Sequence, residues 1–117
     1  MESNIHILSI NTIKDIETEL SSIGVSSRGI DIMKEKLIFL VLKLENVDTR
    51  AANIIKQTML SNGAEAAVSA ATVNLSVSHT DVIIGATIKQ LRQAIQRLQE
   101  QPWGLKEIAK KIEELVA

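Results

Sequence analysis

Apolar positions along the chain recur with two periodicities, one typical of helices and one typical of strands. Steps of three and four residues place apolar side chains on one helix face, whereas alternation places them on one strand face. Two helical segments begin at capping boxes, formed by Thr12 with Asp15 and by Thr87 with Gln90. The predicted helices run over residues 13–23, 49–61, 88–98 and 105–115, and a shorter helix is expected within residues 26–36.

Four short stretches carry strand patterns. The run from Leu37 to Leu42 is apolar at every position, which is typical of a central strand covered by helices on both faces. A short buried helix is the alternative interpretation of this run. The segment 66–71 is ambiguous because it is rich in alanine. The other predicted strands are residues 5–10, 73–77 and 82–85.

The element order that results is β-α-β-α-β-β-α-α, which predicts an α/β (α+β) chain forming a single domain over residues 1–117. Strands separated by helices are expected to pair in parallel through right-handed crossovers, and the last two strands could form an antiparallel hairpin. We therefore expect a single-layer mixed sheet of about four strands, packed with helices on at least one face.

Charge and composition narrow the range of functions. The chain has 13 basic and 14 acidic residues, so it lacks the basic excess that a non-specific nucleic-acid binder needs. It has no cysteine, which excludes disulfides and thiol nucleophiles. The longest apolar run is too short to cross a membrane, and the start Met-Glu-Ser-Asn does not resemble a signal peptide. We expect a cytoplasmic protein without nucleic-acid or membrane partners.

One candidate anion site lies where the last predicted strand meets the helix that begins after Thr87. Gly85, Ala86 and Thr87 are small residues that leave backbone N–H groups accessible at the positive end of that helix. In a parallel sheet this junction would lie at the carboxyl edge, where ligands bind in α/β folds. The simpler interpretation, which we favour, is that Thr87 only caps the helix and Gly85 only lets the chain turn.

A second candidate is the polar face of the helix over residues 49–61. Asn53, Lys56 and Gln57 are spaced at i, i+3 and i+4, so their side chains converge on one face. Two amides and an ammonium group suit a carboxylate, a phosphate or the edge of a heterocycle. From spacing alone, an ordinary solvated face is the preferred interpretation.

Histidines and carboxylates provide no catalytic or metal-binding signature. His6 and His79 are not accompanied by cysteines or clustered carboxylates, so we predict no metal site, no catalytic residue and no cofactor. If the protein is an enzyme, His79 and Asp81 are the visible candidates for its general base. Trp103, between Pro102 and Gly104, is either an exposed ligand anchor or, as we prefer, packed where the two C-terminal helices meet.

Several stretches from about Gly24 to the C-terminus resemble a known domain. The most specific is the pattern A-N-x-x-K-Q-x-M-L-S-x-G, which begins at Ala52. The other stretches are Gly29-Ile30-Asp31-Ile32-Met33 with Lys36, Ala66-Ala67-Val68, Thr80 to Thr87, and Gln101-Pro102-Trp103-Gly104-Leu105. Together they resemble the extra N-terminal domain that precedes the catalytic barrel in some bacterial dihydropteroate synthases.

This resemblance implies a link to folate synthesis but carries over no catalytic residue. The synthase joins a pterin pyrophosphate to p-aminobenzoate in its barrel, and 117 residues are too few for a (β/α)₈ barrel. Two positions depart from the family pattern: Gly63-Ala64 replaces paired glycines, and Trp103 replaces a phenylalanine. Asn53, Lys56 and Gln57 match the pattern, which raises the weight of that candidate site.

These observations predict a non-catalytic, dihydropteroate synthase-related accessory domain. It would bind a small anionic or pterin-like ligand, or a protein partner in folate synthesis, through Asn53, Lys56, Gln57, Gly85 and Thr87. One alternative is a small enzyme acting on a pterin-like or phosphorylated substrate. Another is a homo-oligomer that assembles through its amphipathic C-terminal helices.

Overall fold

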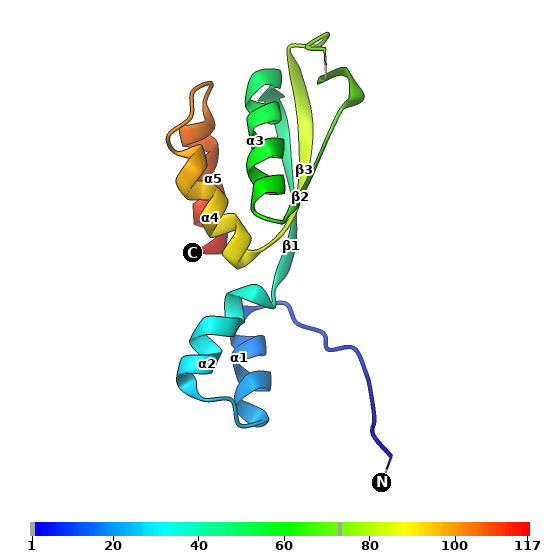
Figure 1. Ribbon diagram of the computed structural model, residues 1–117, viewed down its shortest axis with the longest axis vertical. Helices are drawn as coiled ribbons and strands as arrows, with labels where there is room; N and C mark the ends of the chain where they lie inside the picture. The colour runs from blue at the N-terminus through cyan, green and yellow to red at the C-terminus, as the bar shows by residue number, and fades with distance from the viewer. Residues whose placement is uncertain (1, 73) are drawn as a thin grey trace. The chain divides into compact units, whose positions relative to one another are not determined.

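The computed structural model describes residues 2–72 and 74–117, and its internal contacts divide the chain into two compact units (Figure 1). One unit ends at Ile38, and the other comprises Phe39–Ala117. Compactness alone does not establish independent folding, so the single domain expected over residues 1–117 stays a prediction.

The first unit consists of an irregular N-terminal segment followed by short helices. Helix α1 spans Ile13–Ser22, α2 spans Ser27–Met33, and the 3₁₀ helix η1 spans Lys34–Lys36. The predicted capping box begins α1, since the Thr12 hydroxyl accepts from the Asp15 N–H at 3.1 Å and the Asp15 carboxylate accepts from the Thr12 N–H at 3.1 Å. Gly24 ends this helical segment at φ +88°, a conformation that glycine adopts without strain.

The strand predicted over residues 5–10 is wrong. Residues 2–11 have no regular secondary structure, and the side chains of Ile5 and Ile7 are 96% and 97% exposed. Alternating β-branched residues give a segment the propensity for a strand, but a strand also needs the hydrogen bonds of a neighbour. No described strand pairs with these residues.

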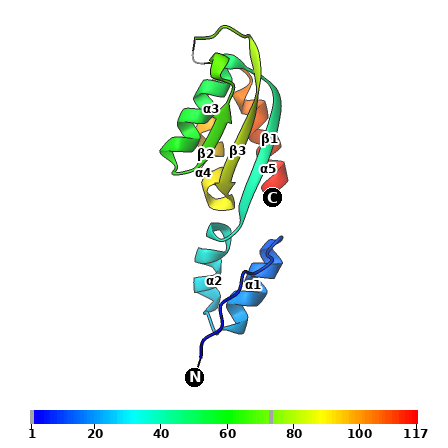
Figure 2. The same cartoon turned by 90° about the vertical axis from the view of Figure 1, so that its right-hand side faces the viewer.

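The second unit is a small antiparallel sheet with helices on one face. Its described elements are β1 (Phe39–Asp48), α3 (Thr49–Ser61), β2 (Glu65–Val68), η2 (Ala70–Thr72), β3 (His79–Thr87), α4 (Ile88–Leu98) and α5 (Leu105–Val116). Within the described residues the sheet has three strands in the order β1-β3-β2, and both pairings are antiparallel. Figures 1 and 2 show α3, α4 and α5 on the same side of this sheet.

The mixed α/β class is therefore confirmed, but several details of the predicted sheet are wrong. The expected parallel crossovers are absent among the described strands, and the count is three rather than about four. The predicted strand over residues 73–77 includes Val73, which lies outside the described residues. Residues 74–77 form a turn in which Leu75 has φ +57°. The ambiguous segment 66–71 divides between β2 and η2.

The apolar run from Leu37 to Leu42 is not a central strand covered on both faces. Most of it belongs to β1, which in the described part of the chain pairs only with β3. Leu40, Leu42 and Leu44 point to the helix side and are half-buried, whereas Phe39 and Val41 on the opposite face are 62% and 69% exposed. A continuous apolar run therefore need not indicate burial on both faces.

The core of this unit lies between the sheet and the helices. Val82, Ile84 and Ala86 of β3 alternate with exposed or half-buried residues and are completely buried against the helix layer. They meet apolar side chains that α3, α4 and α5 direct inward, and the largest of these are Ile55, Met59, Leu91, Leu98 and Leu105. The periodicities that predicted these helices are thus the ones that build the core.

Replacing Thr87 tests the capping box that begins α4. The Thr87 hydroxyl accepts from the Gln90 N–H at 3.1 Å, and the Gln90 side chain accepts from the Thr87 N–H at 2.9 Å. We expect Thr87→Ala to lower the free energy of unfolding of the Phe39–Ala117 unit by about 1 kcal/mol. Urea unfolding followed by Trp103 fluorescence measures this unit directly, because Trp103 is the only tryptophan. Thr87→Ser should retain most of the stability, and equal stability of the alanine variant would contradict the assignment.

Candidate functional site

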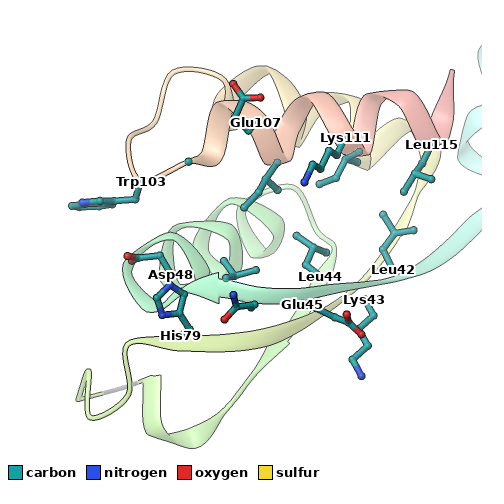
Figure 3. Close-up of a pocket in the computed structure, with 15 residues that line it drawn as sticks. Leu42, Lys43, Leu44, Glu45, Asp48, His79, Trp103, Glu107, Lys111 and Leu115 are labelled. Atoms are coloured by element: carbon teal, nitrogen blue, oxygen red, sulfur yellow. The ribbon is translucent and has the colours of Figure 1, made fainter.

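A groove runs between β1 and α5 on the helix side of the sheet (Figure 3). It forms because α5 packs mainly against α4 and leaves the inward side chains of β1 only half-covered. Its volume is about 590 Å³, which falls in the range of small-molecule sites. The groove is lined by residues 42–48 of β1, His79 of β3, Trp103 and Gly104 of the preceding turn, and Glu107, Ile108, Lys111, Ile112 and Leu115 of α5.

The two ends of the groove differ in chemistry. Leu42 and Leu115 lie beside each other at one end, and Leu44 continues the apolar wall along β1 (Figure 3). Asp48, His79 and Trp103 gather at the other end. An apolar wall that ends in a few polar groups is the usual composition of a binding site for an organic ligand.

Asp48 organises the polar end because it is both the last residue of β1 and the N-cap of α3. Its Oδ1 accepts from the backbone N–H of Arg50 at 2.8 Å, which satisfies a free donor at the helix start. The Arg50 guanidinium adds two bonds, from Nε to Oδ1 at 3.1 Å and from Nη2 to Oδ2 at 2.9 Å. The side-chain bonds from Arg50 lower the pKa of Asp48 to about 2, so the carboxylate is ionised at neutral pH.

Arg50 links this carboxylate to Trp103. The guanidinium carbon lies 4.9 Å from the centre of the Trp103 ring, which is within the range of a cation–π contact. Trp103 itself has φ +59°, a left-handed conformation that is costly for a bulky residue, and its side chain is 45% exposed. The expected packing of Trp103 between the two C-terminal helices is therefore replaced by an exposed ring stacked on a residue of α3.

His79 is placed at the same end by its pairing with Asp48 across β1 and β3. Its Nδ1 lies 3.1 Å from the Ser78 hydroxyl, and its side chain is exposed. A second cavity of about 380 Å³ begins at Asp48 and His79 and continues past Arg50 to Leu75 and Val77. The polar end is therefore accessible from two sides.

The candidate residues on α3 lie elsewhere and line neither cavity. Asn53 donates from Nδ2 to the Thr72 carbonyl at 3.3 Å, so its amide helps to hold η2 against the helix. Lys56 is half-buried and Gln57 is exposed. The helical spacing of these three residues is as predicted, but a shared ligand stays a prediction.

Gly85 and Thr87 form a separate group at the end of β3. A Cβ on Gly85 would lie 3.0 Å from the Phe39 ring, so glycine leaves room for that ring on the open face. The Thr87 hydroxyl and N–H both serve the capping box, and Gln90 also donates to the Asn62 carbonyl at 3.2 Å. Since the sheet is antiparallel, this junction does not lie at a common carboxyl edge.

The sequence does not predict the groove as a site, although it contains some of the residues that form it. Asp48 directly precedes the predicted helix over residues 49–61, and His79 and Trp103 are candidates for separate roles. Their common position depends on the antiparallel pairing of β1 with β3 and on the turn before α5. Among the described residues no group of three or more His, Cys, Asp or Glu side chains is arranged to hold a metal ion. No described helix has the length and apolar character needed to span a membrane.

Comparison with known proteins yields one informative similarity. The chain is 30% identical over 105 residues to a probable bifunctional folylpolyglutamate synthase/dihydropteroate synthase from Halobacterium salinarum. The match covers 90% of this chain but only 13% of that protein. No family model matches the sequence, and no solved structure matches it. The similarity supports the coarse part of the resemblance, a relation to a protein of folate synthesis, whereas correspondence to the N-terminal accessory domain stays a prediction.

The lowered pKa of Asp48 predicts a pH dependence of stability. Because the pKa is lower in the folded state than the ordinary value of 3.8, ionised Asp48 stabilises the fold above about pH 4, and this contribution is lost as the pH falls towards 2. Asp48→Asn should therefore show a smaller loss of melting temperature between pH 5 and pH 2 than the native chain. Arg50→Gln should raise the pKa of Asp48, which NMR titration of the carboxyl carbon measures. An unchanged titration in that variant would contradict the ion pair.

Proposed function

We propose that this chain is a non-catalytic binding module that serves dihydropteroate synthesis. The observation that carries the proposal is the 30% identity, over 90% of the chain, to a protein named as a folylpolyglutamate synthase/dihydropteroate synthase. The chain corresponds to only 13% of that protein's length, so it matches one segment of a much larger multifunctional chain. A segment of this size is suited to binding or assembly, because a (β/α)₈ barrel requires about 250 residues.

The groove between β1 and α5 is the proposed ligand site. Its volume of about 590 Å³ accommodates a bicyclic heterocycle with a short substituent, and Leu42, Leu44 and Ile108 offer the apolar wall that a planar ring requires. At the polar end, Oδ2 of the ionised Asp48 accepts one bond from Arg50 and retains an acceptor position for an N–H donor on the ring edge. A pterin-like compound combines an aromatic bicycle with an edge rich in N–H groups. It therefore matches the apolar wall and the polar end of the groove better than a simple anion does.

The residues predicted from the sequence provide a competing location for the same function. Asn53, Lys56 and Gln57 on α3 would bind an anionic group or contact a protein partner in folate synthesis. Gly85 and Thr87 would contribute at the start of α4. These residues line neither cavity, so variants can separate the two locations.

A thermal-shift titration tests the proposal. The compounds are a pterin, its pyrophosphate, p-aminobenzoate, a folate and inorganic pyrophosphate. A ligand that binds only the folded state adds about 2.7 kcal/mol at a hundred times its Kd, which corresponds to roughly 10 °C in melting temperature for a unit of this size. We expect a selective shift with the pterin compounds.

Matched variants then locate the site. Leu44→Asn changes the groove wall, and Lys56→Ala changes the polar face of α3. Loss of the shift in the first variant alone supports the groove, and loss in the second alone supports the predicted face. If no compound shifts the native protein, ligand binding is wrong. The module would then act through a protein partner, which is tested by adding the chain to a dihydropteroate synthase and measuring complex formation.

The alternative function is a small enzyme acting on a pterin-like or phosphorylated substrate. One observation favours it, which is that His79 lines both cavities and lies next to Asp48. Asp81 is less suited, because its Oδ1 accepts the Asn46 N–H at 3.0 Å and supports the backbone of β1. Substrate turnover that is lost in His79→Ala and retained in Asp81→Asn would establish this alternative, and turnover surviving both changes would dismiss these residues.

A further inference from the structure

Strand β1 is an edge strand whose first half is suited to pairing. Within the described residues it is hydrogen-bonded to β3 on one side, and the backbone groups on its other side have no strand partner. Such an edge is a template for an additional strand. The pairing is regular from Phe39 to Leu44, and a bulge then follows, where Asn46 takes φ +54°. Because a bulge disrupts further pairing, the accessible edge is the segment before it.

This segment exposes apolar side chains on both of its faces. Phe39 and Val41 lie on the open face of the sheet and are 62% and 69% exposed. Leu40 and Leu42 lie on the helix face and are half-buried. Proteins commonly protect an edge with charged residues, but Lys43 is the only charge in the segment from Phe39 to Leu44.

Helix α5 presents a third apolar surface at the same place. Leu115 is 68% exposed, and Figure 3 shows it beside Leu42, at the apolar end of the groove. Neighbouring Val116 is buried, so the exposure of Leu115 is not the fraying of a helix end. The apolar surface around this strand edge therefore has two parts, Phe39 and Val41 on the open face and Leu40, Leu42 and Leu115 on the helix face.

We propose that this surface binds a second copy of the chain, with the two β1 strands paired antiparallel about a two-fold axis at Val41. In this register Val41 lies opposite Val41 of the second copy, Phe39 opposite Lys43, and Leu40 opposite Leu42. Each contact on one side of the axis is repeated on the other, as a two-fold interface requires. The two sheets join into one continuous sheet across the interface.

Charge and the bounds of β1 together favour this register over its neighbours. An axis at Leu40 would set Leu42 and Lys43 against residues 38 and 37, which precede β1. An axis at Lys43 would place two ammonium groups directly opposite, which is destabilising. An axis at Leu42 would bring the two lysines into diagonal contact and set the Glu45 carboxylate against the electron-rich face of Phe39. An axis at Leu44 would require the bulged residues to pair. The axis at Val41 avoids these conflicts and sets Lys43 opposite Phe39, within reach of a cation–π contact with the ring that lies over Gly85.

The same charge pattern argues for a second copy as the occupant. The edge can pair with its own copy without a charge conflict, because Lys43, the only charge between Phe39 and Leu44, then faces Phe39 instead of a second lysine. Leu115 lies close to the axis beside Leu42, so the two-fold brings both copies of this side chain to the interface. The polar end of the groove, with Asp48, His79 and Trp103, lies away from the axis.

A single-cysteine variant tests the register directly, because the native chain has no cysteine. Directly opposed residues in antiparallel strands have Cα atoms about 4.5–5.5 Å apart, which a disulfide can bridge. We expect full-length Val41→Cys to form a disulfide-linked dimer under mild oxidation, at least tenfold faster than Ala67→Cys. Ala67 is the matched control, because it is exposed on β2, the other edge strand. Equal rates in the two variants would overturn the proposed register.

Light scattering tests the association itself. The native chain should show twice the monomer mass, and Val41→Lys, which sets two ammonium groups at the axis, should show the monomer mass. Val41 is exposed, so the melting profile of a dilute, monomeric sample should be unchanged by this substitution. A native chain that stays monomeric at high concentration would overturn the proposal and assign the edge to another occupant. A Val41→Lys variant that remains dimeric would equally overturn it.

Discussion

The one-sided packing of β3 is the constraint on which the rest of the Phe39–Ala117 unit depends. Val82, Ile84 and Ala86 are fully buried against helices, while Ile83, which lies between them, is 47% exposed. Since alternate residues of a strand point to opposite faces, the helix layer fixes which residues of both neighbouring strands can be apolar and covered. Because β1 and β2 pair in register with β3, their residues alternate between the same two faces. The open face of the sheet and the half-covered inward residues of β1 that line the groove follow from this alternation.

Asp48 combines several structural roles with its place in the proposed binding site. It ends β1, caps α3 and receives both hydrogen bonds of the Arg50 guanidinium. Arg50 is in turn held over the Trp103 ring, so the turn before α5 is tied to the start of α3. Trp103 is still 45% exposed beside this contact, so part of its ring remains accessible.

The sequence predicts the helices of this protein far better than its sheet. Each helix carries its own signals, such as the reciprocal bonds of Thr87 with Gln90, and these signals depend only on residues a few positions apart. The sheet depends on partners that are distant in the chain. The run from Leu37 to Leu42 has the composition of a central strand, yet β1 lies at an edge, because local composition does not specify which neighbour a strand meets. Residues 5–10 show the same limit, since they have a strand pattern without a described partner.

The candidate site was harder to predict than the fold for a related reason. Asn53, Lys56 and Gln57 can be grouped by helical spacing alone, whereas Asp48, His79 and Trp103 come from three elements. Only the register of β1 with β3 and the path of the turn before α5 bring them to one end of the groove. Their separation from Leu42 and Leu115 has a physical consequence. A charged cluster loses hydration when it is buried in an interface, while apolar side chains gain from it. The proposed self-association therefore suits the apolar end better, and the proposed ligand suits the polar end, where it can satisfy hydrogen bonds.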